Sequence, residues 1–83
     1  MQTHLNAAGS TLIKTGGCRI ESLSINTGAA TSNIALYDGT SAAGTLVALV
    51  DTTTPRFLQS VWTFRTGLFT VVTGAPDLTM VWR

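Results

Sequence analysis

The side chains that could do covalent chemistry are few and far apart in this sequence. The single cysteine, Cys18, and the single histidine, His4, are the only residues that could form a thiol–imidazole pair. Cys18 alternates with the apolar Ile20, as a buried structural cysteine would, because a free cysteine packs as a small hydrophobe. His4 lies near a terminus, where we expect the chain to be mobile. A serine triad would also depend on His4, and no serine stands in a Gly-x-Ser-x-Gly turn. The sequence therefore predicts a protein that is not an enzyme.

The four acidic residues allow two further kinds of site. Asp38, Asp51 and Asp77 each flank an expected loop, so three carboxylates could meet around Ca²⁺ at one end of the fold. The alternative, which we favour, is that Asp38 and Asp51 shape turns by accepting hydrogen bonds from nearby backbone. Glu21 and an aspartate could form a glycosidase pair, but no spacing selects one. Zinc, EF-hand and phosphate-loop motifs are absent, and we expect no metal and no cofactor.

The aromatic residues permit either a core or a binding platform. Trp62 alternates with Phe64, and Trp82 alternates with Met80, which is typical of side chains that point into a core. An exposed pair of tryptophan and Tyr37 would instead provide a sugar-stacking platform or an interface anchor. We favour the core for the tryptophans.

Composition limits the classes of protein that remain. The chain has 83 residues, 45% of them hydrophobic and 11% charged, with a formal net charge of +1. Its five basic residues are scattered, which does not favour a nucleic-acid partner, and its apolar runs are too short for a membrane helix. We expect one domain over residues 1–83. A chain this short, without a disulfide framework, commonly gains stability by forming oligomers.

Alternating apolar residues separated by glycine-containing turns predict about seven strands and no helix. The expected strands span residues 11–14, 18–27, 33–38, 45–51, 58–65, 68–73 and 77–83. In the second, the alternation changes phase near Ser22, which predicts a bulge. In the fourth, residues 46–50 are continuously apolar, so we expect the sandwich to cover one face and a neighbouring subunit the other. The fold class is all-β: a single small antiparallel β-sandwich of jelly-roll or Greek-key type, with an open barrel as the alternative.

A family resemblance adds a function to this fold. The run NIALYDGTSAAGT (33–45), followed by TGL (66–68), TVV (70–72) and DLTMVWR (77–83), resembles small virion proteins of tailed bacteriophages. The segment DTTTPR (51–56) and the two tryptophans depart from that pattern. The resemblance implies a capsid decoration, or cement, protein on the capsid exterior, made in the host cytoplasm. It implies a homotrimer, with a dimer as the alternative, that clamps the major capsid protein.

Two other classes remain open. One is a different virion part, such as a fibre module or a connector component, and the other is a carbohydrate- or receptor-binding module. For the decoration protein we expect the partners to be copies of itself and the major capsid protein, with no nucleic acid and no membrane. The predicted interface residues are Val47, Leu49, Arg56, Phe57 and Trp82.

Overall fold

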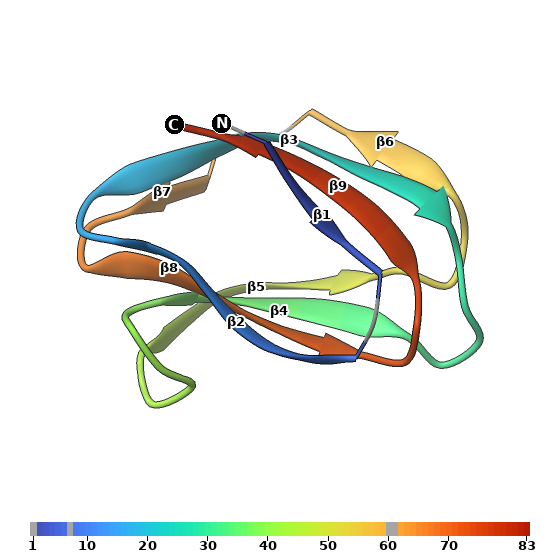
Figure 1. Cartoon of the computed structure of the whole chain (residues 1–83), viewed down its shortest axis with the longest axis horizontal. Coiled ribbons are helices and arrows are strands. Elements are labelled where there is room, and N and C mark those ends of the chain that lie inside the picture. Colours follow the sequence, from blue (N-terminus) through green and yellow to red (C-terminus); the bar gives the residue numbers. More distant parts are fainter. Residues whose placement is uncertain (1, 7, 60–61) are drawn as a thin grey trace.

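The computed structural model describes residues 2–6, 8–59 and 62–83, and these residues form two antiparallel sheets packed face to face (Figure 1). The part of the chain that the structure describes contains no helix. The strands are β1 (Gln2–Leu5), β2 (Gly9–Thr15), β3 (Cys18–Thr27), β4 (Asn33–Asp38), β5 (Thr45–Asp51), β6 (Arg56–Leu58), β7 (Trp62–Phe64), β8 (Gly67–Thr73) and β9 (Asp77–Trp82). The predicted small β-sandwich is confirmed.

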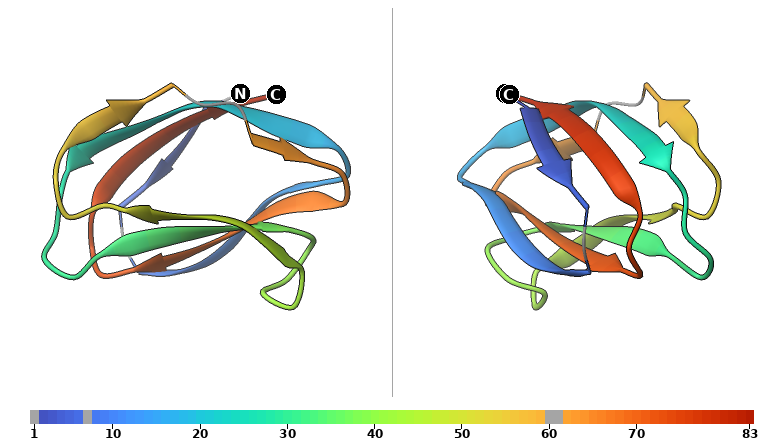
Figure 2. Two further views of the ribbon diagram at one scale, coloured as in Figure 1. Left: turned by 180° about the vertical axis from the view of Figure 1, so that it is seen from behind. Right: turned by 45° about the vertical axis from the view of Figure 1, so that its right-hand side comes forward.

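The two layers are a five-stranded and a four-stranded sheet, seen one above the other in Figure 2. The five-stranded sheet has the order β1-β9-β3-β6, and β7 also pairs with β3. The four-stranded sheet has the order β2-β8-β4-β5. Among the strands described, β4 and β5 are the one consecutive pair that forms a hairpin. Every other pairing joins strands that are distant in the chain, as in Greek-key sandwiches.

The core lies between the sheets and follows the alternation of the sequence. Ile34 and Leu36 on β4, like Leu78 and Met80 on β9, are fully buried. Cys18 and Trp82 are also buried core residues, as their alternation predicts. The core is therefore built from one side of each sheet.

The phase change in β3 is a bulge, as predicted. The pairing of β3 with β9 shifts register between Ile20 and Ser22. Ile20 and Leu23 are three residues apart, yet both are fully buried. The extra residue in this stretch lets both side chains reach the core.

Two strand predictions were wrong. Gln2–Leu5, expected to be mobile, form β1, because their backbone pairs with β9. The single strand expected over 58–65 is two strands, β6 and β7, which both pair with β3. Three residues separate Leu58 from Trp62, but only two separate their partners Leu23 and Ile20, so one uninterrupted register is impossible. Ser60 and Val61 lie outside the described residues.

Candidate interaction surface

The outward side of the four-stranded sheet is apolar across all four strands. On β4, Ile34 and Leu36 point into the core, so Ala35 and Tyr37 point outward. The strand registers align the outward side chains in two rows. One row is Leu12, Phe69, Tyr37 and Leu46, and the other is Ser10, Val71, Ala35 and Leu49. We call these eight residues the apolar face.

A bulge in β5 places two leucines on the apolar face. Leu36 pairs with Ala48, but Tyr37 pairs with Leu46, so Val47 is an extra residue in β5. Leu46 and Leu49 can therefore both point outward although they are three residues apart.

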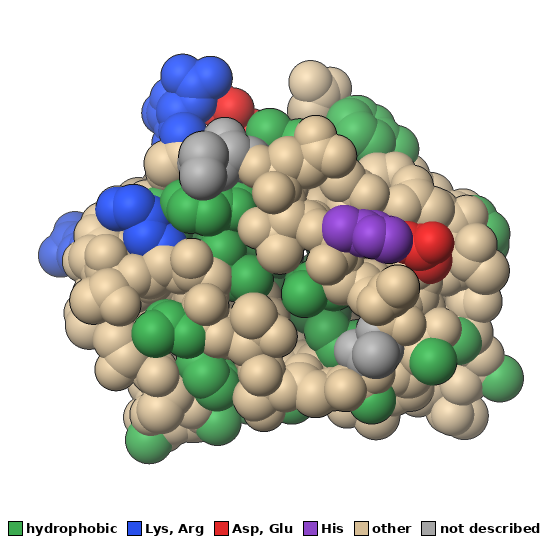
Figure 3. All heavy atoms as spheres, viewed as in Figure 1, with side chains coloured by type: hydrophobic (Ala, Val, Ile, Leu, Met, Phe, Trp, Pro, Cys, Tyr) green, Lys and Arg blue, Asp and Glu red, His purple; other side chains and the backbone are tan. Residues whose placement is uncertain are grey.

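Several side chains of the apolar face are solvent-exposed. The exposed fractions are 44% for Leu12, 51% for Leu46 and 62% for Leu49. Between these edges, the rings of Tyr37 and Phe69 pack edge to face, with centroids 6.5 Å apart. Figure 3, which views the sheet edge-on, shows separate hydrophobic side chains among polar atoms at the lower margin of the molecule. An exposed apolar area that crosses a whole sheet is typical of an interaction site.

The outward side of the five-stranded sheet carries mostly polar side chains. The row that crosses it is His4, Thr79, Ser24 and Phe57, of which only the last is apolar. Asn26 connects part of this side, because its Nδ2 donates a hydrogen bond of 2.9 Å to Oγ1 of Thr79. The sandwich thus has one polar and one apolar outer side.

The polar side also holds the single histidine. His4 contacts the carboxylate of Asp77, and Figure 3 shows the two side chains together on the surface. This contact lowers the pKa of Asp77, because a hydrogen-bond donor favours the ionised carboxylate. His4 therefore lies on an ordered strand with an acidic partner.

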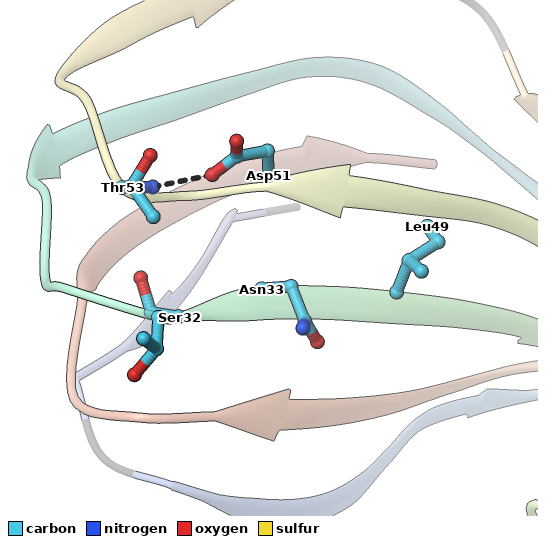
Figure 4. Close-up of a pocket in the computed structure, with 6 residues that line it drawn as sticks. Ser32, Asn33, Leu49, Asp51 and Thr53 are labelled. Carbon is cyan, nitrogen blue, oxygen red and sulfur yellow. Dashed lines mark hydrogen bonds between the residues drawn. The ribbon is translucent and has the colours of Figure 1, made fainter.

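A hollow of about 340 Å³ adjoins one end of the apolar face. Its lining residues are Thr31, Ser32, Asn33, Leu49, Asp51 and Thr53. Figure 4 shows Asn33 and Leu49 on the neighbouring strands β4 and β5, with Asp51 and Thr53 farther along the chain. Oδ1 of Asp51 accepts a 2.8 Å hydrogen bond from the backbone amide of Thr53, which lowers the pKa of Asp51. The hollow has polar walls and one apolar wall.

The predicted chemical residues do not converge. Cys18 is buried between the sheets, and burial raises the pKa of its thiol, so the thiolate nucleophile is disfavoured. His4 lies on the outward side of the same sheet, beside Asp77. A sheet therefore separates the thiol from the imidazole.

The three loop aspartates have separate structural roles. Asp51 shapes its own turn by binding the Thr53 amide, as predicted. Asp38 instead stabilises a turn that is distant in the chain. Its Oδ1 accepts hydrogen bonds from the backbone amides of residues 65–67, and the bond from Thr66 is 2.8 Å long. These hydrogen bonds lower the pKa of Asp38. Asp77 binds His4. Over residues 2–6, 8–59 and 62–83, no three His, Cys, Asp or Glu side chains form a group that could hold a metal ion.

The predicted interface residues lie in three places. Val47 and Leu49 are exposed on β5, the latter on the apolar face. Arg56 and Phe57 are exposed on β6, in the other sheet. Trp82 is 8% exposed, and its Nε1 donates a 2.9 Å hydrogen bond to Oγ1 of Thr3, so it belongs to the core of the subunit.

The sequence-based interface omitted residues of the apolar face on β2 and β8. Leu12, Phe69 and Val71 were not selected, although each stands next to one apolar residue in its strand: Ile13, Leu68 and Val72. Apolar residues at both odd and even positions of a strand were the available signal, because they indicate a strand covered on two sides.

The fold and surface define a class: a small antiparallel β-sandwich with one polar and one apolar outer side. No family model, curated protein or solved structure matches the chain. Within the residues that the structure describes, no helix is long and apolar enough to cross a membrane.

Proposed function

We propose that this protein is a non-enzymatic structural component of a bacteriophage virion that decorates the outer capsid as a homo-oligomer and stabilises the shell. The apolar face is the observation that carries the proposal. A subunit with such a face is suited to permanent contact with protein, because contact removes Leu12, Leu46 and Leu49 from water. The resemblance of segments 33–45, 66–68, 70–72 and 77–83 to small virion proteins supports the capsid as the site of action.

The size of the subunit fits this function. A molecule of 31 × 23 × 17 Å offers little area for any single contact with a shell. Joining several subunits makes each later contact intramolecular, so the oligomer binds far more tightly than one subunit. We propose the major capsid protein as the partner in the shell, and synthesis in the host cytoplasm before assembly.

The copy number of the chain in intact particles tests the proposal. Quantitative mass spectrometry of purified particles should find this chain in a fixed ratio to the major capsid protein. A fibre module or a connector component would be present in a few copies at one vertex or along the tail. Absence from particles, or a few copies in each, would contradict the decoration function.

The hollow beside Leu49 favours a second candidate, a carbohydrate- or receptor-binding module. Its hydroxyl, amide and carboxylate groups beside one apolar wall are the kinds of group that bind sugars. The aromatic platform, the alternative to a core position for the tryptophans, is less suitable, because Trp82 is buried and Trp62 is partly buried. A glycan array tests this candidate. Binding that is lost in an Asp51→Ala variant would support it, and an array without any bound glycan would contradict it.

A further inference from the structure

We propose that the apolar face is covered by the same face of a second copy of this chain, in a face-to-face pair of sandwiches. The inference deepens the proposed function, since it names the contact that makes the homo-oligomer. It depends on the shape, charge and edge structure of the four-stranded sheet.

The extents of the molecule set an upper limit on the area of a face-to-face pair. In Figure 1, which looks down the shortest axis with the longest axis horizontal, the two sheets lie one above the other. Each sheet therefore lies in the plane of the longest and shortest extents of the molecule, 31 and 17 Å, and occupies part of that plane. A contact over this whole plane, the apolar face together with its rim, would remove at most about 500 Å² from each partner and about 1,000 Å² in total, which is where specific interfaces begin. We expect a pair that dissociates on dilution.

The charge distribution suits contact between two identical faces. The two rows contain no charged residue. Among the described outward-facing residues of these strands, the charged residue nearest to the rows is Asp51, at the end of β5. Two copies whose rows meet therefore bury no charged side chain, and Asp51 lies at the margin of the contact. If the polar side formed such a contact instead, the hydrated side chains of His4 and Asp77 would lose their water, which costs free energy.

The edge of β5 argues for contact through faces instead of added strands. β5 is an edge strand of the four-stranded sheet, and strand addition needs a regular row of free backbone groups. The bulge at Val47 interrupts that row in the middle of the strand. Bulges increase local twist and oppose edge-to-edge pairing.

Symmetry favours two copies over three. An isologous contact uses one surface on both partners and closes at two, whereas a closed trimer needs two different contact surfaces on each subunit. The described residues provide one outer sheet side with a continuous apolar surface. The structure thus supports the dimer, the alternative to the trimer that the resemblance implies.

A matched pair of charge substitutions tests the inference. Leu49→Asp places a carboxylate on the apolar face, and Phe57→Asp places one at a position of nearly equal exposure, 60% against 62%, on the other outer side. Sedimentation equilibrium over a wide concentration range measures the mass of the full chain. Wild type and Phe57→Asp should rise from one to two subunits, with Leu49→Asp at least tenfold weaker in association. Far-ultraviolet circular dichroism checks that each variant is folded, and Leu46→Ser serves as a second variant if Leu49→Asp is not.

Three results of the sedimentation experiment would overturn the inference. A wild type that stays monomeric at every concentration, a mass of three subunits, or equal weakening by both substitutions would do so. Binding of the same proteins to particles that lack this chain separates the two proposals. A monomer whose particle binding is lost in Leu49→Asp would mean that the capsid covers the face. Decoration of the capsid would then survive, but neither the pair nor the homo-oligomer would. A dimer that never binds particles would retain the pair and contradict the decoration function.

Discussion

Gly67 lies where three parts of the four-stranded sheet meet, so a single methyl group there should be destabilising. It begins β8, and its carbonyl accepts a 3.1 Å hydrogen bond from the amide of Gly39. A Cβ atom on Gly67 would lie 2.8 Å from the carbonyl oxygen of Gly39 and 2.8 Å from that of Lys14. Both contacts are with backbone atoms, which cannot move away by changing rotamer. Gly67→Ala must therefore separate β8 from its neighbours.

The magnitude follows from the cost of overpacking. Extra atoms in a packed interior cost about 1–3 kcal/mol, and two backbone contacts put Gly67→Ala in the upper part of this range, about 2–3 kcal/mol. For a domain of this size, that loss lowers Tm by about 10–20 °C. Gly17→Ala is the matched control, because its Cβ would meet only the carbonyl oxygens of Phe64 and Arg65, at 3.7 and 3.9 Å. We expect Gly17→Ala to be neutral or to stabilise slightly, since alanine restricts the unfolded chain.

Denaturant titration followed by tryptophan fluorescence measures both variants. Trp82 is buried and Trp62 is partly buried, so unfolding should change their emission. All samples must have the same protein concentration, because dimerisation would add to the apparent stability. Unfolding free energies of Gly67→Ala and Gly17→Ala that agree within about 0.5 kcal/mol would refute the close approach of the three segments.

Three further predictions concern buried and charged groups. The folded-state pKa of Asp38 is lowered. Its contribution to the unfolding free energy is therefore complete above the unfolded pKa of about 3.9, and it is lost as pH falls through the folded value. Asp38→Asn should therefore unfold with a weaker pH dependence below about pH 5, and titrations at stepped pH that give equal slopes for both proteins would contradict this. Cys18 should react with a thiol reagent only after unfolding, so rapid labelling of the native protein would disprove its burial. Thr52→Val removes a buried hydroxyl that donates a 2.6 Å hydrogen bond to Oγ of Ser32, and should cost about 1 kcal/mol in a denaturant titration; an unchanged midpoint would show that this bond adds no stability.

The sequence predicted the sandwich because alternation reports directly on which side of a strand is buried. The phase change at Ser22 could be recognised because Ile20 and Leu23 cannot share a side without an extra residue. The division of 58–65 into two strands could not be found in the same way. It depends on the register of these residues along β3, which is a relation between segments distant in the chain. The formation of β1 also depends on a segment distant in the chain, because pairing with β9 supplies its hydrogen bonds.

The sequence indicated the part of the apolar face that lies on β5, but not the parts on the other strands. The continuous apolar residues 46–50 indicated two covered faces, and the structure points Ala48 and Val50 toward the core and Leu46 and Leu49 outward. The strands that continue this face could not be identified from the sequence, because strand order decides which outward residues are neighbours. Phe69 and Tyr37 are 32 positions apart in sequence but adjacent in the sheet.

The exposed apolar residues of the chain lie mainly on one side of the fold. Mean hydropathy is +0.32, and the low fraction of charged residues suggests an evenly apolar surface. Instead, the outward side of the five-stranded sheet carries His4, Ser24 and Thr79, and the apolar excess lies on the other side. Completing the burial of a half-exposed leucine contributes about 1 kcal/mol, and the apolar face has three such residues. A domain of this length buries only about 60% of its unfolded surface and is marginal alone. Contact at the apolar face would therefore strengthen the fold and build the assembly through the same atoms.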